Sequence, residues 1–516
     1  MKKQVKYQNV HRTFWVINII NCRNIIGQIV DFEHLSQTKI QKMAEGGISR
    51  TGSESESNLT HSSMYSRHSQ HYVESVSVEI CNIMTRLGYG EEIRRWRVAK
   101  YCEFDRHANA RLSSITLKTA GSKAEGLTCL LESDRDFLLT LNGVICVETG
   151  INLNTIPDDI SVFWMDDTGV YPGHCILLLK RPARLLNAII NALCEIGYGE
   201  LLLSSVLFID ECSRLINKHR LGALGAVLHE RAGPALPETL RGLFKFDMVY
   251  SIRCQCPSIL HRWAVRPRHW PQSVIVQKVV SLGAYVTPTG FKESENKHIE
   301  WRICFNSGET ELLNNLNDTQ AKVYILLKWI LKEIIKPTNK EITSYVLKNI
   351  ILWQAENTPQ TEFHSRSLLH WLHDGLRGLR AAIEKKQLNY YMIPERNLME
   401  ACGLDDALKR QWIIDITEMI EMGPNVILRL EKIRKAIVAS PEPMLWFSKT
   451  RIELEMLYLE EMNRVAKCEN ENGEQDVPDF MVYAIRKREE EIELEVAARM
   501  LMEGCSNPKL VFRMFV

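Results

Sequence analysis

The spacing of apolar residues changes near Trp301, and this change constrains the fold more than any other feature of the chain. Before Trp301, short apolar runs of the kind that form strands alternate with stretches of helical spacing. After it, apolar residues recur at helical spacing in residues 311–335, 340–356, 366–386 and 403–420. The pattern predicts an α+β first part followed by a mostly helical second part.

Chain length and local composition divide the 516 residues further. At roughly 100–200 residues per domain, such a chain holds about two to four domains. Residues 44–70 are rich in Ser, Gly, Thr and His and offer little to bury, so we expect residues 1–70 to be a disordered N-terminal segment. Residues 401–516 are helical in pattern and highly charged, which predicts a helical C-terminal extension that binds a protein partner.

The formal net charge is +1, the balance of 64 Lys and Arg against 63 Asp and Glu. This balance excludes a protein that is basic over its whole surface. It conceals an uneven distribution, because residues 401–516 hold 16 basic and 22 acidic residues, a net of −6, and the rest of the chain therefore carries +7. A local basic face that binds nucleic acid is compatible with this distribution.

The 14 cysteines are spread from Cys22 to Cys505 without a dense framework, which is typical of reduced thiols in a cytosolic protein. We therefore expect a cytoplasmic location, with a nuclear one as the alternative. Polar residues interrupt the longest apolar runs, so no membrane segment is predicted. Cys254, Cys256 and His261 would supply at most three zinc ligands, so we expect no structural zinc, with this cluster as the minor alternative.

Acidic residues beside strand-like apolar runs predict a metal-dependent site. Asp134 and Asp136 lead into the run Phe137–Leu141, and alternate residues of a strand point to the same face, so the two carboxylates should lie side by side. Asp247 lies inside a second such run, where an acid without a partner is costly to bury. Upstream, Gly121–Ser122 offers backbone N–H groups and a hydroxyl to a phosphate. Carboxylates, Mg²⁺ and a phosphate cradle are the parts of a two-metal nucleotidyl-transfer site.

The same residues have an ordinary structural interpretation. A Gly-Ser pair and an Asp-x-Asp pattern occur often by chance, and exposed acids are usually solvated loop residues. Spacing alone leaves both interpretations open.

The Gly-Ser and acidic segments belong to a series of motifs that follow one another in order along residues 71–400. They comprise residues 121–127, 133–136, 246–249, 254–271, 300–305 and 391–398. Together they resemble the Mab-21-like family, which includes cyclic GMP-AMP synthase and the cGAS-like receptors of animals. The resemblance implies a nucleotidyltransferase core with a central mixed sheet and a long spine helix in residues 71–310. It also implies an all-helical HhH/H2TH-like lobe in residues 311–400.

The resemblance assigns roles to the acidic site. The family's catalytic, metal-binding acids fall on Asp134, Asp136 and Asp247, with Mg²⁺ or Mn²⁺ as the cofactor. The first acid is often Glu in cyclic GMP-AMP synthase, and the shorter Asp134 reaches less far. The phosphate-side pair falls on Gly121 and Ser122.

Four further residues match nucleotide contacts of the family: Arg302, Lys328, Ser344 and Tyr345. Cations suit phosphate charge, and an aromatic face suits a base. Without the resemblance, Lys328 would be interpreted as a solvated helical lysine and Tyr345 as a half-buried packing residue.

The resemblance further implies that a long basic helix binds double-stranded nucleic acid. The basic residues predicted to follow a phosphate backbone are Arg94, Arg95, Arg97, Lys100, Arg106 and Arg111. Residues 253–268, with interleaved tryptophans, are a second and weaker basic stretch, and either stretch would otherwise be an ordinary solvated surface. Cyclic GMP-AMP synthase carries a His/Cys zinc insertion after the strand that matches residues 300–305. No counterpart follows here, so RNA is favoured over DNA.

These features predict a cGAS-like receptor of innate immunity. It would sense double-stranded RNA or DNA and make a cyclic dinucleotide from ATP, GTP or both. One alternative is a catalytically silent member of the family that acts in development or as an interaction scaffold. Another is a nucleotidyltransferase that adds nucleotides to RNA ends.

Overall fold

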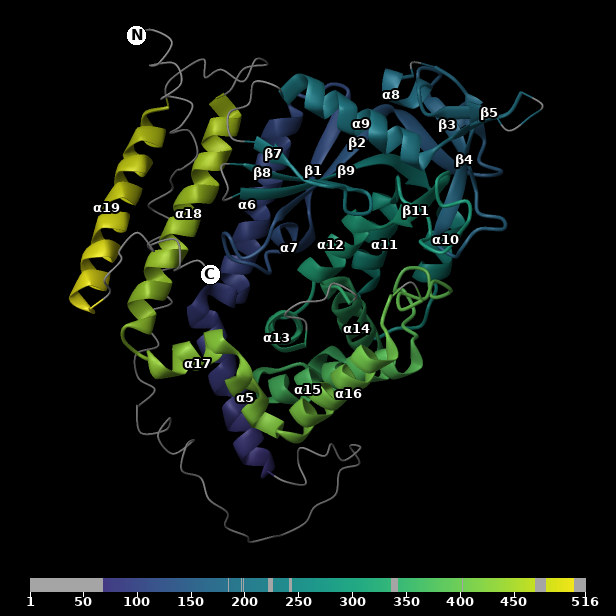
Figure 1. The fold of residues 1–516 in the computed structure, drawn as a ribbon. Helices are drawn as coiled ribbons and strands as arrows, with labels where there is room; N and C mark the ends of the chain where they lie inside the picture. Colours follow the sequence, from purple (N-terminus) through teal and green to yellow (C-terminus); the bar gives the residue numbers. More distant parts are fainter. Residues whose placement is uncertain are drawn as a thin grey trace.

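The computed structural model describes residues 68–183, 185–195, 197, 199–220, 226–240, 244–335, 342–400, 402–468 and 479–504. Of the N-terminal segment predicted to be disordered, residues 1–67 lie outside the described residues. Figure 1 shows a sheet and its helices joined to a helical lobe, with two long helices, α18 and α19, along one side. The α+β first part and the helical second part predicted from the apolar spacing are both confirmed.

The described chain begins with two helices in series. Helix α5 (Gln70–Met84) starts at Ser69, whose hydroxyl accepts a hydrogen bond from the Tyr72 N–H. A short π-helical turn, η1 (Thr85–Tyr89), separates α5 from α6 (Glu91–Asn109). Gly88 has a φ of +81° in this turn, a conformation that glycine adopts without strain. Two glycines so close together, Gly88 and Gly90, predict a break in the helical pattern, and the structure has that break.

The central sheet is mixed, and β2 is its organising strand. This strand pairs in parallel with β3 and with β9, whereas the other pairings are antiparallel. The pairings β2–β3–β4–β11–β10–β9 return to β2, so the central strands form a closed circuit. The strands of the sheet are β1 (Ile115–Ala120), β2 (Arg135–Glu148), β3 (Ser161–Asp166), β4 (His174–Arg181), β5 (Leu193–Glu195), β6 (Leu201–Leu203), β7 (Ala226–Leu228), β8 (Ala235–Leu240), β9 (Phe244–Gln255), β10 (Ala284–Thr287) and β11 (Glu300–Cys304).

Two local predictions were wrong. An Asn-Gly pair after an apolar strand is a hairpin-turn signal, so Asn142–Gly143 predicts a turn, but β2 continues through both residues. The pairing of β2 with β9 shifts between Thr140 and Ile145, so the Asn-Gly pair lies at a β-bulge. The apolar pattern of residues 182–231 predicts helices, but this segment contains strands β5, β6 and β7 as well as the short helix α8 (Asn187–Ile190) and helix α9 (Ser205–Arg220). Short apolar runs do not distinguish a buried strand from a buried helix.

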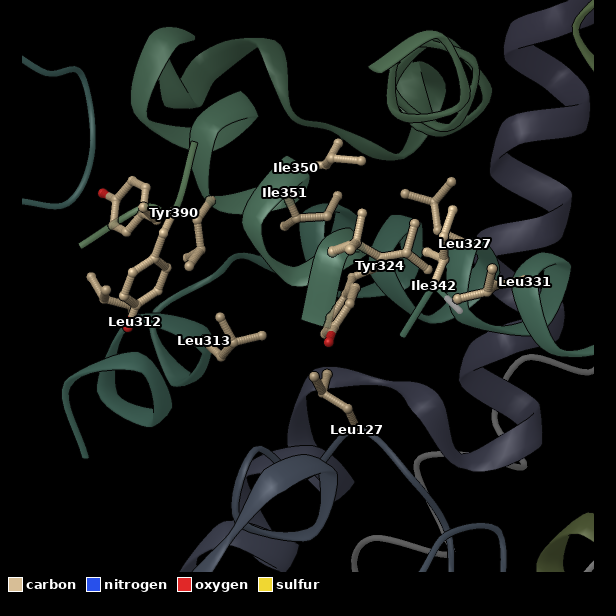
Figure 2. Packing of buried hydrophobic residues seen from close by; sticks show 14 of the residues in the cluster. Leu127, Leu312, Leu313, Tyr324, Leu327, Leu331, Ile342, Ile350, Ile351 and Tyr390 are labelled. Atoms are coloured by element: carbon tan, nitrogen blue, oxygen red, sulfur yellow. The ribbon is translucent and has the colours of Figure 1, made fainter. Parts of the chain in front are cut away.

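The helices that come after β9 in the chain begin at Pro257, and two of them precede β10 and β11. They are α10 (Pro257–Ala264), α11 (Ser273–Leu282), α12 (Asn306–Asn314), α13 (Asp318–Ile330), α14 (Ser344–Asn357), α15 (Leu368–Lys385) and α16 (Asp406–Glu421). The predicted helix 311–335 divides before α13, where Asn317 and Gln320 form a reciprocal capping box. In Figure 2, Leu127 from the sheet side of the molecule points toward Tyr324, and Leu312 lies near Tyr390. One apolar core therefore joins the sheet to the helical lobe.

The C-terminal helices pack on the first part of the chain. They are α17 (Glu431–Val438), α18 (Met444–Cys468) and α19 (Phe480–Met502). Ile93 of α6 forms a buried cluster with Ile452 and Met456 of α18. A second cluster joins Tyr101 of α6, Leu459 of α18 and apolar residues of α19. Figure 1 shows α18 between α6 and α19. The predicted extension thus belongs to the core of the molecule.

None of the helices in the described part of the chain combines the length and apolarity that crossing a bilayer requires.

Candidate functional site

Two of the three predicted catalytic acids are brought together by the sheet. Asp136 on β2 is the direct register partner of Asp247 on the parallel strand β9. Ala120, the last residue of β1, pairs with Asp136 on the opposite side. Asp134 precedes β2 and is exposed. Neighbouring strands lie about 4.8 Å apart, so the side chains of these two register partners lie next to each other on the same face of the sheet.

Gly121 lies directly against the Asp136 carboxylate. A Cβ atom at Gly121 would lie 1.9 Å from Asp136 Oδ2, and the φ of Gly121 is +61°. Only glycine meets both conditions. Gly121 begins the short helix α7 (Gly121–Ala124), so the Gly-Ser turn and the acids are parts of one site, as their order in the sequence predicted.

Negative charge is concentrated around Asp136. Burial raises the pKa of Asp136 to about 7, and the carboxylates of Asp247, Glu125 and Asp134 add to this rise, whereas Lys348 opposes it. A bound divalent cation would relieve this repulsion, so the donor set fits Mg²⁺ or Mn²⁺. No three metal-ligating side chains within the described residues are already arranged to hold an ion, so the acids would have to adjust to bind one.

Lys328 reaches the Gly-Ser turn from the helical lobe. Its Nζ donates a hydrogen bond of 2.6 Å to Ser122 Oγ. Burial lowers the pKa of Lys328 to about 8, although Glu125 and Glu132 act in the opposite direction. The two residues predicted to contact phosphate therefore meet in the structure, across the boundary between the sheet and α13.

Arg302 and Tyr345 lie in a second part of the site. Burial alone would lower the pKa of Arg302, but neighbouring Cys304, Tyr345 and Tyr390 raise it above its ordinary value. The rings of Tyr345 and Tyr390 are 5.9 Å apart. Ser344 is exposed at the first position of α14. The predicted base-facing residues are therefore neighbours.

Three charged residues of this region were not predicted. Lys348 Nζ lies 2.5 Å from Glu125 Oε1 and 3.4 Å from Glu309 Oε2. Glu309 also accepts hydrogen bonds of 2.6 Å and 2.7 Å from the hydroxyls of Tyr345 and Tyr390. Glu125 and Glu309 are buried. The position of Glu125 three residues after Ser122 was the one available signal, because Glu309 and Lys348 resemble ordinary helical residues.

The predicted nucleic-acid surface on α6 requires a correction at two residues. Arg94 is buried and donates to the carbonyls of Leu313 and Leu316. Arg97 is fully buried, and its Nη2 lies 2.6 Å from Glu455 of α18. A guanidinium that satisfies buried protein groups is not available to a phosphate backbone.

The other basic residues of α6 differ in exposure. Lys100 is half-buried, with its Nζ 2.5 Å from Glu460. Arg111 is half-buried, whereas Arg95 and Arg106 are exposed. The exposed residues of the helix form one stripe, which we call the α6 stripe: Glu92, Arg95, Ala99, Cys102 and Arg106. For Arg95 and Arg106, nucleic-acid binding stays a prediction.

The second basic stretch is largely structural. Arg266 lies 2.8 Å from Glu356, and Trp263 and Trp270 are buried. Cys254 and Cys256, the minor alternative for zinc, are buried while His261 is exposed, so these three side chains do not share one environment.

Comparison with known proteins places these elements in a family. Residues 231–315 match the Mab-21 protein nucleotidyltransferase domain, and residues 319–411 match the Mab-21 protein HhH/H2TH-like domain. Asp247, Arg302, Lys328 and Tyr345 lie within the matched residues, whereas Gly121 and the first two acids precede them.

A curated relative is similar over a shorter stretch. It is the cyclic GMP-AMP synthase-like receptor of Aethina tumida, 27% identical over 168 residues, which are 31% of this chain. The match spans 41% of the length of that relative. The chain therefore carries the two domains of the Mab-21 family, a nucleotidyltransferase domain followed by an HhH/H2TH-like domain.

Proposed function

We propose that the protein is a cGAS-like receptor that joins ATP, GTP or both into a cyclic dinucleotide when it binds double-stranded nucleic acid. The observation that carries the proposal is the register pair of Asp136 and Asp247, with Gly121 packed against the Asp136 carboxylate. A carboxylate pair beside a Gly-Ser turn is the arrangement that nucleotidyl transfer requires. The Mab-21 nucleotidyltransferase domain and the named relative support it.

Asp134, Asp136 and Asp247 are the residues that would hold Mg²⁺ or Mn²⁺. When bound, such ions lower the pKa of an acceptor hydroxyl and neutralise charge on the leaving pyrophosphate. Asp134 is exposed just before β2, and Asp136 and Asp247 are register partners on β2 and β9, so the three carboxylates would have to converge to hold an ion.

The remaining residues bind and orient the nucleotides. Ser122 and Lys328 already share a hydrogen bond, and a triphosphate would replace it with two charge-assisted contacts. Arg302 and Tyr345 would receive a base, the ring by stacking and the guanidinium by hydrogen bonding. Glu309 holds the Tyr345 hydroxyl, which restricts the ring to one orientation.

The α6 stripe is the surface that we propose for the duplex. Its side chains are exposed, and the small Ala99 and Cys102 between the two arginines would leave room for a phosphate backbone to approach. The absence of a zinc insertion in the sequence makes RNA the favoured ligand. Contacts of this type read shape and charge and not sequence.

Product analysis tests the proposal. Purified protein is incubated with ATP, GTP and Mg²⁺, with and without duplex RNA or duplex DNA, and the products are separated and weighed by mass spectrometry. We expect a cyclic dinucleotide that appears with a duplex and is lost in Asp136→Ala. No dinucleotide product under any condition would refute the proposal, and nucleotides added to RNA ends would identify the alternative transferase.

A scaffold function is the second candidate, and α19 favours it. Several large apolar side chains of this helix are exposed, among them Phe480, Tyr483 and Leu494. Exposed apolar side chains on one element are typical of protein–protein contact. If a cellular phenotype of the protein is unchanged by Asp136→Ala and is lost on Tyr483→Glu, the scaffold function accounts for it.

A further inference from the structure

Arg135, between the two acids of the Asp134-Arg135-Asp136 motif, has no role in the site described so far. Successive residues of a strand point to opposite faces of the sheet, so the Arg135 side chain lies on the face opposite to the one that carries Asp136. The side chain is 9% exposed. No ion pair within 4.0 Å is found for it among the described residues, which is unusual for a buried cation.

An aromatic cage surrounds this guanidinium. Its central carbon lies 4.1 Å from the ring centre of Phe104, 4.6 Å from Phe137 and 5.1 Å from Tyr101. Two of these rings belong to α6 and the third to β2 itself. Cation–π attraction in a desolvated cage offsets part of the cost of burying the charge. Burial still lowers the pKa of Arg135, against the opposing effects of Tyr101, Tyr458 and Asp105.

Arg135 also makes polar contacts with two elements besides α6 and β2. Nη1 donates to the Met462 sulfur on α18, and Nη2 lies 3.4 Å from Thr119 Oγ1 on β1. Thr119 in turn donates a hydrogen bond of 2.6 Å to Asp105 of α6. One side chain therefore contacts α6, α18 and β1 at the residue that separates the two acids.

We propose that Arg135 is a positioning residue that fixes the carboxylates of Asp134 and Asp136 relative to α6 and α18. A packing role alone would be filled better by an apolar side chain, because a buried cation without an anionic partner costs stability. The guanidinium offers what an apolar residue lacks, namely cation–π contacts with three rings and directed hydrogen bonds at once. The proposal rests on the catalytic role proposed for the acids. It adds that α18, at the far end of the chain, is coupled to them.

Arg135→Met separates positioning from packing. Methionine fills an aromatic cage well, so we expect the melting temperature to be unchanged or higher. We expect kcat to fall roughly tenfold to a hundredfold with little change in KM, the size that a small misplacement of catalytic groups produces. Arg135→Lys, which keeps the charge but not the planar fork, should recover part of kcat. Arg410→Met on the exposed face of α16 is the matched control and should change neither quantity.

Two further measurements do not depend on catalysis. Hydrogen exchange of the backbone at residues 133–137 should be faster in Arg135→Met, with exchange in the helical lobe unchanged. Met462→Leu removes the sulfur acceptor at nearly constant volume and should also make exchange at residues 133–137 faster. In the double variant, Arg135→Met with Met462→Leu, exchange at these residues should be no faster than in Arg135→Met alone.

The outcomes separate the two proposals. If the wild-type protein makes no product but residues 133–137 lose protection in both variants, the proposed function fails and the positioning role stands. If the melting temperature falls in parallel with kcat, Arg135 is only structural and the inference is overturned. Unchanged exchange at residues 133–137 overturns it as well.

Discussion

Gly121 is the residue at which backbone conformation and chemistry are most tightly linked. Alanine there would place a methyl group 1.9 Å from Asp136 Oδ2 at a φ of +61°. We expect Gly121→Ala to abolish Mn²⁺ binding measured by electron paramagnetic resonance, because the carboxylate must turn away. Gly143→Ala is the control, since its φ is +77° but no atom lies within 4 Å of the added methyl group. It should cost about 1–2 kcal/mol of stability and leave metal binding intact. Equal losses in both variants would contradict the argument.

The lowered pKa of Lys328 predicts that nucleotide binding depends on pH. Burial lowers its pKa to about 8, so the amine is charged below pH 8 and neutral above it. Affinity for the metal-free triphosphate should therefore decrease as the pH rises from 7 to 9.5, and binding near pH 9 should take up a proton. Calorimetry in buffers of different ionisation enthalpy measures both effects. Lys328→Arg stays charged throughout, so a decrease of the same size in that variant would show that another group titrates.

At the scale of single residues, the sequence was informative where chemistry demands a rare pattern. Acids that lead into apolar strands were recognisable, and the Gly-Ser pair suggested a phosphate contact for Ser122, whereas Lys328 was assigned to phosphate through the family resemblance. Glu309 and Lys348 were not recognised as site residues, because each looks like a solvated helical residue in the sequence. Only the fold places Lys348 between Glu125 and Glu309. Such long-range ion pairs leave no local signature in a sequence.

Helix α6 has two faces with different partners, and its buried face carries a testable ion pair. Arg97 and Glu455 are both buried and lie 2.6 Å apart. Arg97→Met should destabilise the protein by about 3–5 kcal/mol, because it leaves the Glu455 charge buried without compensation. Arg97→Met combined with Glu455→Leu should recover most of that loss, since two apolar side chains replace the pair. Urea unfolding of the single and double variants measures the difference, and an additive double variant would refute it.

At the scale of elements, the positions of helices were easier to predict than the pairing of strands or the packing of other elements against the helices. Periodicity located α14, α15 and α16 but merged the end of α12 with α13. A turn signal at Asn142–Gly143 was overridden by the pairing of β2 with its neighbours. The basic stretch on α6 was recognised as a helix, yet its periodicity did not reveal that α18 covers Arg97. A sequence shows which face of a helix is apolar. Which other element packs over a charged face depends on the tertiary structure, which the sequence of the helix alone does not show.

For the molecule as a whole, the C-terminal helices are predicted to be necessary for folding. Deletion of all residues after Cys468 removes α19 and exposes apolar residues of α18, which should lower the melting temperature. Deletion of all residues after Val438 also uncovers Ile93 and Tyr101 on α6 and leaves Arg97 unpaired. We expect this shorter chain to aggregate on expression. Recovery of a soluble monomer with native circular dichroism would show instead that the extension is dispensable.

The contact between α6 and α18 also determines when the protein can complete its fold during its synthesis. Glu455 follows Arg97 by 358 residues, which at ~5–20 residues per second takes roughly 20–70 s on the ribosome. Throughout that interval the face of α6 that α18 will cover remains open to water and to other chains. The buried clusters around α6 can therefore close only after α18 has emerged, and chaperones are expected to attend the nascent chain until then.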